Sequence, residues 1–299
     1  MVLVIFMYAL FASTFTLGKA VLSYVSPFLF IGMRMILGGS LLLAYYRWVK
    51  KQSIVIHKAD YSLFLCIILF HIFCAYTLEF WALEYVTSSK ACLLYNLSPF
   101  ITALFSYFLF SERLSYRQMC GLMIGFLGFI PILVAQTPLE KIGLHVSFLS
   151  IYEIALIASV TSSAYGWMMV KHLMSRHYSL LLINGISMTG GGILALLLSL
   201  TTEGFSGLKV TSGEQLIMLG GYCLALVIIA NIIGYNLYGY LLTRYSATFL
   251  SFAGFMTPLF AALLGWVFLG EQVTWHFFAT ISMVILGLYL FHNEKKLVL

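Results

Sequence analysis

Long apolar stretches, each separated from the next by a short polar or charged cluster, follow one another along the whole chain. A helix needs roughly 20 apolar residues to cross a membrane. Cutting the chain at its charges, prolines and polar clusters yields stretches of about that length at 2–22, 28–48, 61–84, 86–110, 116–134, 148–171, 178–200, 214–240, 246–269 and 275–292. The pattern predicts an all-α membrane protein with ten transmembrane helices, because lone strands cannot satisfy their backbone in lipid.

The composition excludes a soluble protein. The chain is 62% hydrophobic and only 9% charged, with a mean hydropathy of +1.01. A soluble domain carries about a quarter charged residues, so we expect the lipid bilayer as the surroundings. The net charge of +6 is scattered over the loops. Since no basic run is interleaved with aromatic residues, we expect no nucleic-acid partner.

Sequence motifs for metals, nucleotides and processing do not occur. The five cysteines fall within apolar stretches without a CxxC spacing, which predicts free thiols and neither disulfides nor a metal site. No GxxxxGK[ST] motif occurs, so we expect no ATP drive within the chain and no cofactor. The first stretch lacks a charged leader and a cleavage site, and we interpret it as a retained transmembrane helix.

The second half of the chain repeats the first. Shifting the first half by 159 positions aligns several residues in register: Tyr76 with Tyr235, Leu83 with Leu242, Pro99 with Pro258, and Glu112 with Glu271. Toward the N-terminus the offset falls to 153, which aligns Gly38-Gly39 with Gly191-Gly192, and then to 146. Such periodicity indicates an internal duplication. We predict one five-helix repeat over residues 1–135 and another over residues 147–292.

Because each predicted repeat has an odd number of helices, the two copies must cross the membrane in opposite directions. Of the 16 Lys and Arg residues, 11 fall on one predicted side, four fall on the other, and Arg34 lies within a helix. The side richer in basic residues faces the cytoplasm, so we expect both termini there. Inverted repeats are typical of secondary transporters, which bind substrate between the halves near mid-membrane.

Each half also carries a proline step followed by a polar helix end. The two motifs are Ser98-Pro99 with Ser111-Glu112-Arg113-Leu114-Ser115, and Thr257-Pro258 with Gly270-Glu271-Gln272-Val273-Thr274. In these motifs the chain resembles the EamA-type branch of the drug/metabolite transporter superfamily. The resemblance implies ten helices, alternating access and transport of a small polar metabolite across a bacterial inner membrane. A narrower similarity is to the carriers of intracellular bacteria that exchange S-adenosylmethionine for S-adenosylhomocysteine.

The first helix departs from this family. The Trp-Gly step common there is replaced by Phe11-Ala12-Ser13. The departure argues against carrying a substrate role over to that helix.

Glu79 is the main candidate for substrate binding. It lies well inside the apolar stretch 61–84, where an ionisable group is costly and usually faces a cavity or a partner. Tyr76 is one helical turn away on the same face. A carboxylate beside aromatic rings suits an organic cation, through Coulomb attraction and cation–π contact. The alternative is a structural ion pair with Arg34 or Lys19.

Further polar and aromatic groups at membrane depth complete the predicted substrate site: Tyr95, Asn96, Trp167, Asn231 and Tyr235. Pro99 and Pro258 are predicted hinges, because proline inside a helix removes a hydrogen bond and kinks it. A static kink for packing is the alternative. We expect His71 to be a hydrogen-bonded packing residue, with a proton relay as its alternative.

Other functions need features that the sequence does not offer as clearly. An intramembrane enzyme needs a convergent acid, base or metal set, which Glu79 and the scattered histidines do not supply. A non-transporting receptor needs no inverted repeats. Among transporters, an exporter of amino acids or related amphipathic metabolites is the alternative. Transport direction, coupling ion and oligomeric state stay open.

Overall fold

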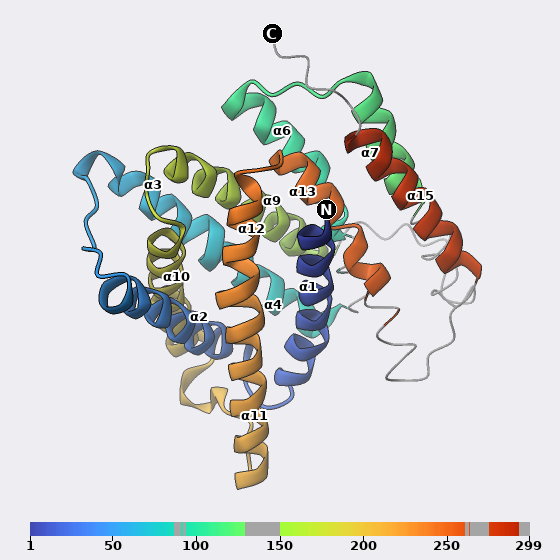
Figure 1. Ribbon diagram of the computed structural model, residues 1–299. Helices are drawn as coiled ribbons and strands as arrows, with labels where there is room; N and C mark the ends of the chain where they lie inside the picture. Colours follow the sequence, from blue (N-terminus) through green and yellow to red (C-terminus); the bar gives the residue numbers. More distant parts are fainter. Residues whose placement is uncertain (87–90, 92–93, 129–149, 261–262, 264–274, 293–299) are drawn as a thin grey trace.

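The computed structural model of the chain describes residues 1–86, 91, 94–128, 150–260, 263 and 275–292 (Figure 1). Within these ranges every regular element is a helix, and the only β pairing is an isolated bridge between Val25 and Leu208. The all-α prediction is therefore confirmed.

The observed helices follow the predicted apolar stretches closely. Those of the first half are α1 (Val2–Val21), α2 (Pro27–Ala44), η1 (Tyr45–Val49), η2 (Lys58–Asp60), α3 (Tyr61–Cys66), η3 (Ile67–Cys74), α4 (Ala75–Tyr85), α6 (Ser98–Phe110) and α7 (Tyr116–Leu127). Those of the second half are α9 (Ile151–Ser175), α10 (Leu180–Thr202), η5 (Gly204–Gly207), α11 (Gly213–Leu226), η6 (Val227–Gly234), α12 (Tyr235–Leu242), α13 (Ala247–Ala253) and α15 (Trp275–His292). Four continuous helical segments of the described chain are long and apolar enough to span a membrane: Pro27–Val49, Lys58–Tyr85, Leu180–Thr202 and Gly213–Leu242.

Local sequence signals fix where two of the helices begin. Ser115 precedes α7 and Ser150 precedes α9, and each side chain accepts a hydrogen bond from the backbone N–H three residues later. The residues at those positions, Gln118 and Glu153, bond back to the backbone of the serine. These reciprocal capping boxes satisfy backbone groups that the first turn of a helix leaves unpaired.

The two longest helical rods share an uncommon feature at the same place. Both η3 and η6 are π-helices of eight residues, and they begin at Ile67 and Val227. π-Helical segments are rare and occur often at functional sites. Directly after them, Tyr76 and Tyr235 lie in the first turn of α4 and α12.

Helices that correspond in the two repeats pack against each other. The most extensive contact joins α2 to α10, while α6 packs on α13 and α7 lies beside α15 at one edge of the bundle (Figure 1). Two further contacts are counterparts of each other in the two repeats. The rod of η3 and α4 packs on α9 of the other repeat, and the corresponding rod of η6 and α12 packs on α1. This pattern of pairs is what an internal two-fold axis produces.

The α2–α10 pair shows that the repeats are inverted. Glu203, the C-cap of α10, accepts hydrogen bonds from the backbone N–H groups of Phe28 and Leu29 at 3.0 and 3.1 Å. The start of α2 therefore lies at the end of α10, so these corresponding helices are antiparallel. Midway along the pair, Gly39 lies so close to Thr189 that a Cβ would overlap it. The predicted inverted arrangement is confirmed.

Polar contacts between helix ends fall into two opposite layers. In one layer Asp60 pairs with Arg176, and Lys171 Nζ lies 2.8 Å from Glu112 Oε1. In the other, Lys209 Nζ lies 3.6 Å from Glu84 Oε1. Helix ends that the distribution of Lys and Arg assigns to one side of the membrane therefore lie in one layer. The layer with Asp60 and Glu112 is the more basic of the two.

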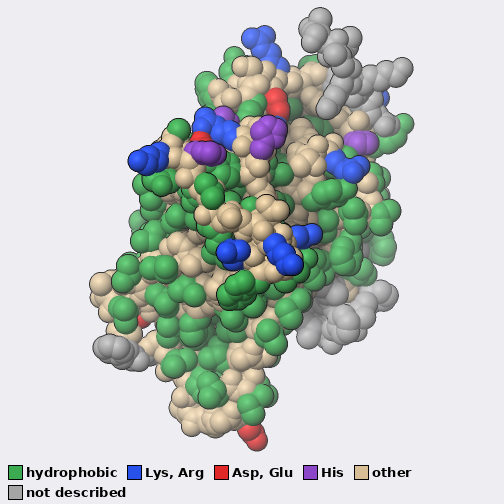
Figure 2. Space-filling view, turned by 60° about the vertical axis from the view of Figure 1, so that its left-hand side comes forward, with side chains coloured by type: hydrophobic (Ala, Val, Ile, Leu, Met, Phe, Trp, Pro, Cys, Tyr) green, Lys and Arg blue, Asp and Glu red, His purple; other side chains and the backbone are tan. Residues whose placement is uncertain are grey.

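Between the layers the outer surface is apolar. The side chains of Phe108, Ile217 and Ile285 are 71%, 77% and 62% exposed. Figure 2 shows hydrophobic side chains covering much of one face of the molecule. A surface of this kind fits lipid, and the chain is a multi-pass membrane protein.

Candidate functional site

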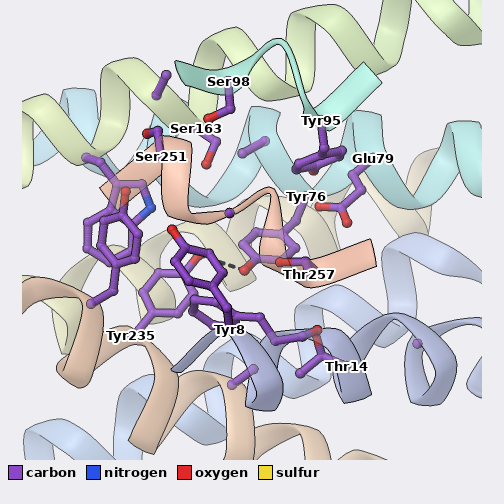
Figure 3. Close-up of a pocket in the computed structure, with 18 of the residues that line it drawn as sticks. Tyr8, Thr14, Tyr76, Glu79, Tyr95, Ser98, Ser163, Tyr235, Ser251 and Thr257 are labelled. Carbon is purple, nitrogen blue, oxygen red and sulfur yellow. Dashed lines mark hydrogen bonds between the residues drawn. The ribbon is translucent and has the colours of Figure 1, made fainter. Parts of the chain in front are cut away.

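A cavity of about 1330 Å³, its open mouth included, lies between the two repeats (Figure 3). Its walls come from α1, α2, α4 and α6 of the first repeat and from α9, α12 and α13 of the second. Six of the seven predicted substrate residues line it: Tyr76, Glu79, Tyr95, Asn96, Trp167 and Tyr235. Residues chosen as polar groups in apolar sequence thus converge on one space.

Asn231, the seventh predicted residue, lies behind the wall and does not line the cavity. It is fully buried, and its Oδ1 accepts a hydrogen bond of 2.8 Å from Nε of the cavity residue Arg34. Its amide nitrogen lies 3.0 Å from the sulfur of Met35. The structure therefore makes Asn231 a residue that positions Arg34.

Two tyrosines that correspond in the repeats meet inside the cavity. The Tyr235 hydroxyl donates to the Tyr76 hydroxyl at 2.7 Å, and their ring centroids lie 6.3 Å apart (Figure 3). The internal two-fold axis thus passes between these side chains. Trp167 extends the aromatic surface, with its ring centroid 5.2 Å from that of Tyr235.

Glu79 extends into the cavity from α4, on the same side as Tyr76 (Figure 3). Its carboxylate interacts with the Tyr95 hydroxyl and with the charge of Arg34. Among the described side chains, however, no lysine or arginine comes within ion-pair distance of it. The alternative of a direct ion pair with Arg34 is therefore wrong, and the side chain of Lys19 lies outside the described residues.

The helices around the predicted hinges are interrupted rather than kinked. In place of one helix over 86–110, a turn at Asn96–Leu97 precedes α6, and Pro99 lies in the first helical turn. In the second repeat a turn at Gly254–Phe255 likewise precedes Pro258. Proline in a first turn breaks no helical hydrogen bond, so the prediction of prolines inside a helix is wrong. Both breaks border the cavity, and the hinge role stays a prediction.

The first helix contributes to the cavity despite its departure from the family pattern. Tyr8, Phe11 and Thr14 line the wall, so α1 borders the cavity although the family's Trp-Gly step is replaced there. Their spacing of three residues puts them on one face of the helix. That spacing was the available signal in the sequence.

The cavity is closed on the side of the Asp60–Arg176 contact. There the rings of Trp167 and Tyr238 lie 4.1 Å apart, and the Tyr8 hydroxyl donates to the Leu250 carbonyl at 2.5 Å. In the opposite direction the lining reaches Gly18 and Leu83, which lie near the far ends of α1 and α4. Among the described residues, the lining of the cavity therefore extends from mid-membrane toward the less basic layer.

His71 lies directly behind this closed side. It is fully buried, with ring centroids 4.4 Å from Trp167 and 5.2 Å from Tyr235. Neither ring nitrogen has a hydrogen-bond partner among the described residues. His71 therefore packs between helices as predicted, whereas the predicted hydrogen bond is absent from the described part of the chain.

Metal ligands and disulfides do not enter the described site. Cys66, Cys74, Cys120 and Cys223 are free thiols, and Cys92 lies outside the described residues. No group of three or more His, Cys, Asp or Glu side chains in the described part could hold a metal ion. The chemistry available in the cavity is that of a carboxylate, a guanidinium, hydroxyls and aromatic faces.

Comparison with known proteins identifies the architecture. Residues 1–134 and 150–292 match the model of the EamA-like transporter family. The chain is 31% identical to the S-adenosylmethionine/S-adenosylhomocysteine transporter of Chlamydia trachomatis serovar L2, over 96% of this chain and 86% of that protein. It is equally identical to the transporter of the same description in Chlamydia muridarum, over 96% of this chain and 89% of the relative. An uncharacterized transporter of Bacillus subtilis, YvbV, is 24% identical over 98% and 92% of the two chains.

A crystal structure of another protein superposes with a TM-score of 0.75 and covers 96% of this chain and 94% of its own, at 18% identity. At that identity the likeness concerns the fold alone. The family match covers both repeats, and the cavity lies between them. Inverted repeats around a central cavity are the construction of a secondary transporter of small metabolites. The chain belongs to the EamA-like transporter family.

Proposed function

We propose that the protein exchanges S-adenosylmethionine for S-adenosylhomocysteine across a bacterial inner membrane, with both termini in the cytoplasm. The observation that carries this proposal is the cavity between the repeats, where a carboxylate and an aromatic surface face the same space. The similarity to transporters of these two metabolites over 96% of the chain supports it. An exporter of amino acids is the competing function.

The chemistry of the ligands matches the lining. S-adenosylmethionine carries an adenine ring, a sulfonium and an α-amino acid head. Aromatic faces such as those of Tyr76, Tyr235 and Trp167 can stack on adenine and attract a cation. Glu79 adds a negative charge in a setting where an uncompensated charge is costly. Binding would be followed by rocking of one repeat against the other, which exposes the cavity to the closed side.

Counterflow into proteoliposomes tests the exchange. We expect vesicles loaded with S-adenosylhomocysteine to take up labelled S-adenosylmethionine much faster than empty vesicles, because an exchanger returns fastest with a ligand bound. Chromatography of the vesicle contents should recover the label as intact S-adenosylmethionine, as expected of a transporter that is not an enzyme. Uptake that ignores both metabolites but follows loaded amino acids would replace the proposal with the competing function.

Reporter fusions test the orientation. A reporter placed after Lys141, between the predicted repeats, should face the opposite side of the membrane from one placed at Leu299. The fusion at Leu299 should report the cytoplasm, because the side with 11 basic residues is expected there. Two fusions on the same side would contradict the topology, and a C-terminus outside would contradict only the orientation.

A further inference from the structure

Two opposite charges line the cavity. Among its described lining residues, Arg34 from α2 and Glu79 from α4 are the charged ones. They influence each other electrostatically, but no described ion pair joins them to each other or to another side chain. Separated charges in a site of low polarity are costly. A ligand that carries both charges would compensate both at once.

Arg34 is held in one orientation. Its side chain is almost fully buried, with a residue exposure of 3%, and its Nε is bound by Asn231. The guanidinium carbon lies 5.3 Å from the centre of the Tyr76 ring and 5.9 Å from that of Phe30. Asn231 engages Nε, and the Tyr76 hydroxyl interacts with the guanidinium as well. The two terminal amino groups carry four N–H donors, which leaves enough of them for the two-point contact that a guanidinium makes with a carboxylate.

From this arrangement we propose that Arg34 binds the carboxylate of an α-amino acid head while Glu79 faces the ammonium group of the same head. Arg34 then becomes a specificity-determining residue, and Asn231 is its positioning residue. For the adenosyl ligands the assignment rests on the proposed function. Arg34 and Glu79 by themselves fit any ligand that carries a carboxylate and an ammonium group, with or without the adenosyl part.

The exchange of two ligands favours this assignment over one in which Glu79 binds the sulfonium. S-adenosylmethionine and S-adenosylhomocysteine share the amino acid head and the adenosine, whereas only the first has the positive sulfur. A site that must hold both in turn reads the shared head with its two charges. The extra positive charge then falls to the aromatic faces of Tyr76, Tyr235 and Trp167.

Removal of the carboxylate from the ligand tests Arg34 directly. The purified protein is titrated with S-adenosylhomocysteine and with its decarboxylated analogue, which keeps the ammonium, the sulfur and the adenosine. We expect wild type to prefer the carboxylated ligand by about 10- to 100-fold, the range of a charge-assisted hydrogen bond. Arg34→Gln should bring the two dissociation constants to within about threefold of each other, because the charged contact to the carboxylate is lost. Arg34→Lys should be intermediate, because an ammonium lacks the planar fork.

The matched control is Arg117→Gln, which removes a positive charge from an exposed position on α7. It should leave the preference of wild type unchanged. An unchanged preference in Arg34→Gln overturns the proposal. If that variant loses the melting transition of wild type, Asn231→Ala replaces it, since it keeps the charge but releases Nε. That variant should lose part of the preference, and full retention of the preference overturns the proposal.

A second ligand pair separates this inference from the proposed function. If wild type binds neither adenosyl compound, phenylalanine is compared with phenethylamine, which differs from it only in lacking the carboxylate. Preference for phenylalanine that disappears in Arg34→Gln would uphold the zwitterion site and reject S-adenosylmethionine as substrate. Absence of a carboxylate preference in both ligand pairs would overturn the inference.

Discussion

The rods α4 and α12 have the same geometry but different chemistry. Each follows an eight-residue π-helix, and each brings a tyrosine to the two-fold axis, where Tyr76 and Tyr235 bond to each other. One turn later, the same offset of 159 makes Tyr238 the counterpart of Glu79 in the second repeat. Glu79 brings a charge to the cavity, whereas Tyr238 packs its ring against Trp167, with the centroids 4.1 Å apart and the rings tilted by 35°. The two repeats therefore share their backbone arrangement, but the negative charge at this position occurs in the first repeat alone.

The corresponding helices α2 and α10 repeat this lesson. With the offset of 153, Arg34 of α2 corresponds to Ser187 of α10. Ser187 is fully buried, and its hydroxyl donates to the Asn184 carbonyl of its own helix at 3.1 Å. Both cavity charges therefore belong to the first repeat. We expect positions that match in the two repeats to determine stability, and positions that differ between them to determine ligand affinity.

The largest effect is expected where the repeats touch. In Gly39→Leu the new side chain would collide with Thr189 and with the Gly185 carbonyl, and overpacking of this kind costs about 3 kcal/mol or more when the backbone must move. The matched control is Gly220→Leu on α11, where a Cβ meets nothing within 4 Å. Melting in detergent should fall sharply for the first variant only. Equal melting temperatures would show that the α2–α10 contact is dispensable.

The next effect separates Glu79 from its counterpart. Glu79→Gln should weaken binding of both adenosyl ligands by roughly 1–3 kcal/mol, because it removes a charge-assisted contact to the shared ammonium. Tyr238→Phe should cost under about 1 kcal/mol, since it keeps the ring contact with Trp167 and removes a neutral hydroxyl. Competition binding measures both variants. A loss confined to S-adenosylmethionine would instead place the sulfonium at Glu79, and comparable losses in the two variants would remove the asymmetry.

A smaller effect tests the two-fold axis itself. Tyr76→Phe and Tyr235→Phe each remove one end of the same hydrogen bond, and each should destabilise the protein by about 0.5–1.5 kcal/mol. Because the shared bond is lost in either case, the double variant should be little worse than Tyr76→Phe alone; that single variant also removes the contact of the Tyr76 hydroxyl with Arg34. Thermal melting of the three proteins shows whether this holds. Fully additive losses would mean that the hydroxyls act independently.

The smallest effect is expected at the helix ends. Lys171→Met breaks the contact with Glu112, whose two side chains are 26% and 37% exposed. An ion pair so accessible to water contributes about 0–1 kcal/mol. Ligand affinity should not change, since neither residue lines the central cavity. A change in affinity would give the polar helix end a part in substrate binding.

The helices and most of the site were predictable because lipid imposes simple rules. Apolar length set the helix bounds, and Tyr76 and Glu79 stood out as polar groups in apolar sequence. The place of Asn231 was not predictable, because a polar residue at membrane depth can face a cavity or, as here, bond a neighbouring side chain behind its wall. The break before Pro99 was missed for a related reason, since a proline is compatible with both a kink and a new first turn.

The Glu203 contact has a mechanical consequence. Its carboxylate ties the last turn of α10 to the first turn of α2, while Gly39 holds the centre of the same pair in close contact. Widening this pair would remove the acceptor of the Phe28 and Leu29 N–H groups, while Ser199 of α10 would still donate to the carboxylate; leaving the two N–H groups unpaired would cost several kcal/mol. We therefore expect α2 and α10 to stay together as one unit during transport, with the remaining helices of each half moving about it.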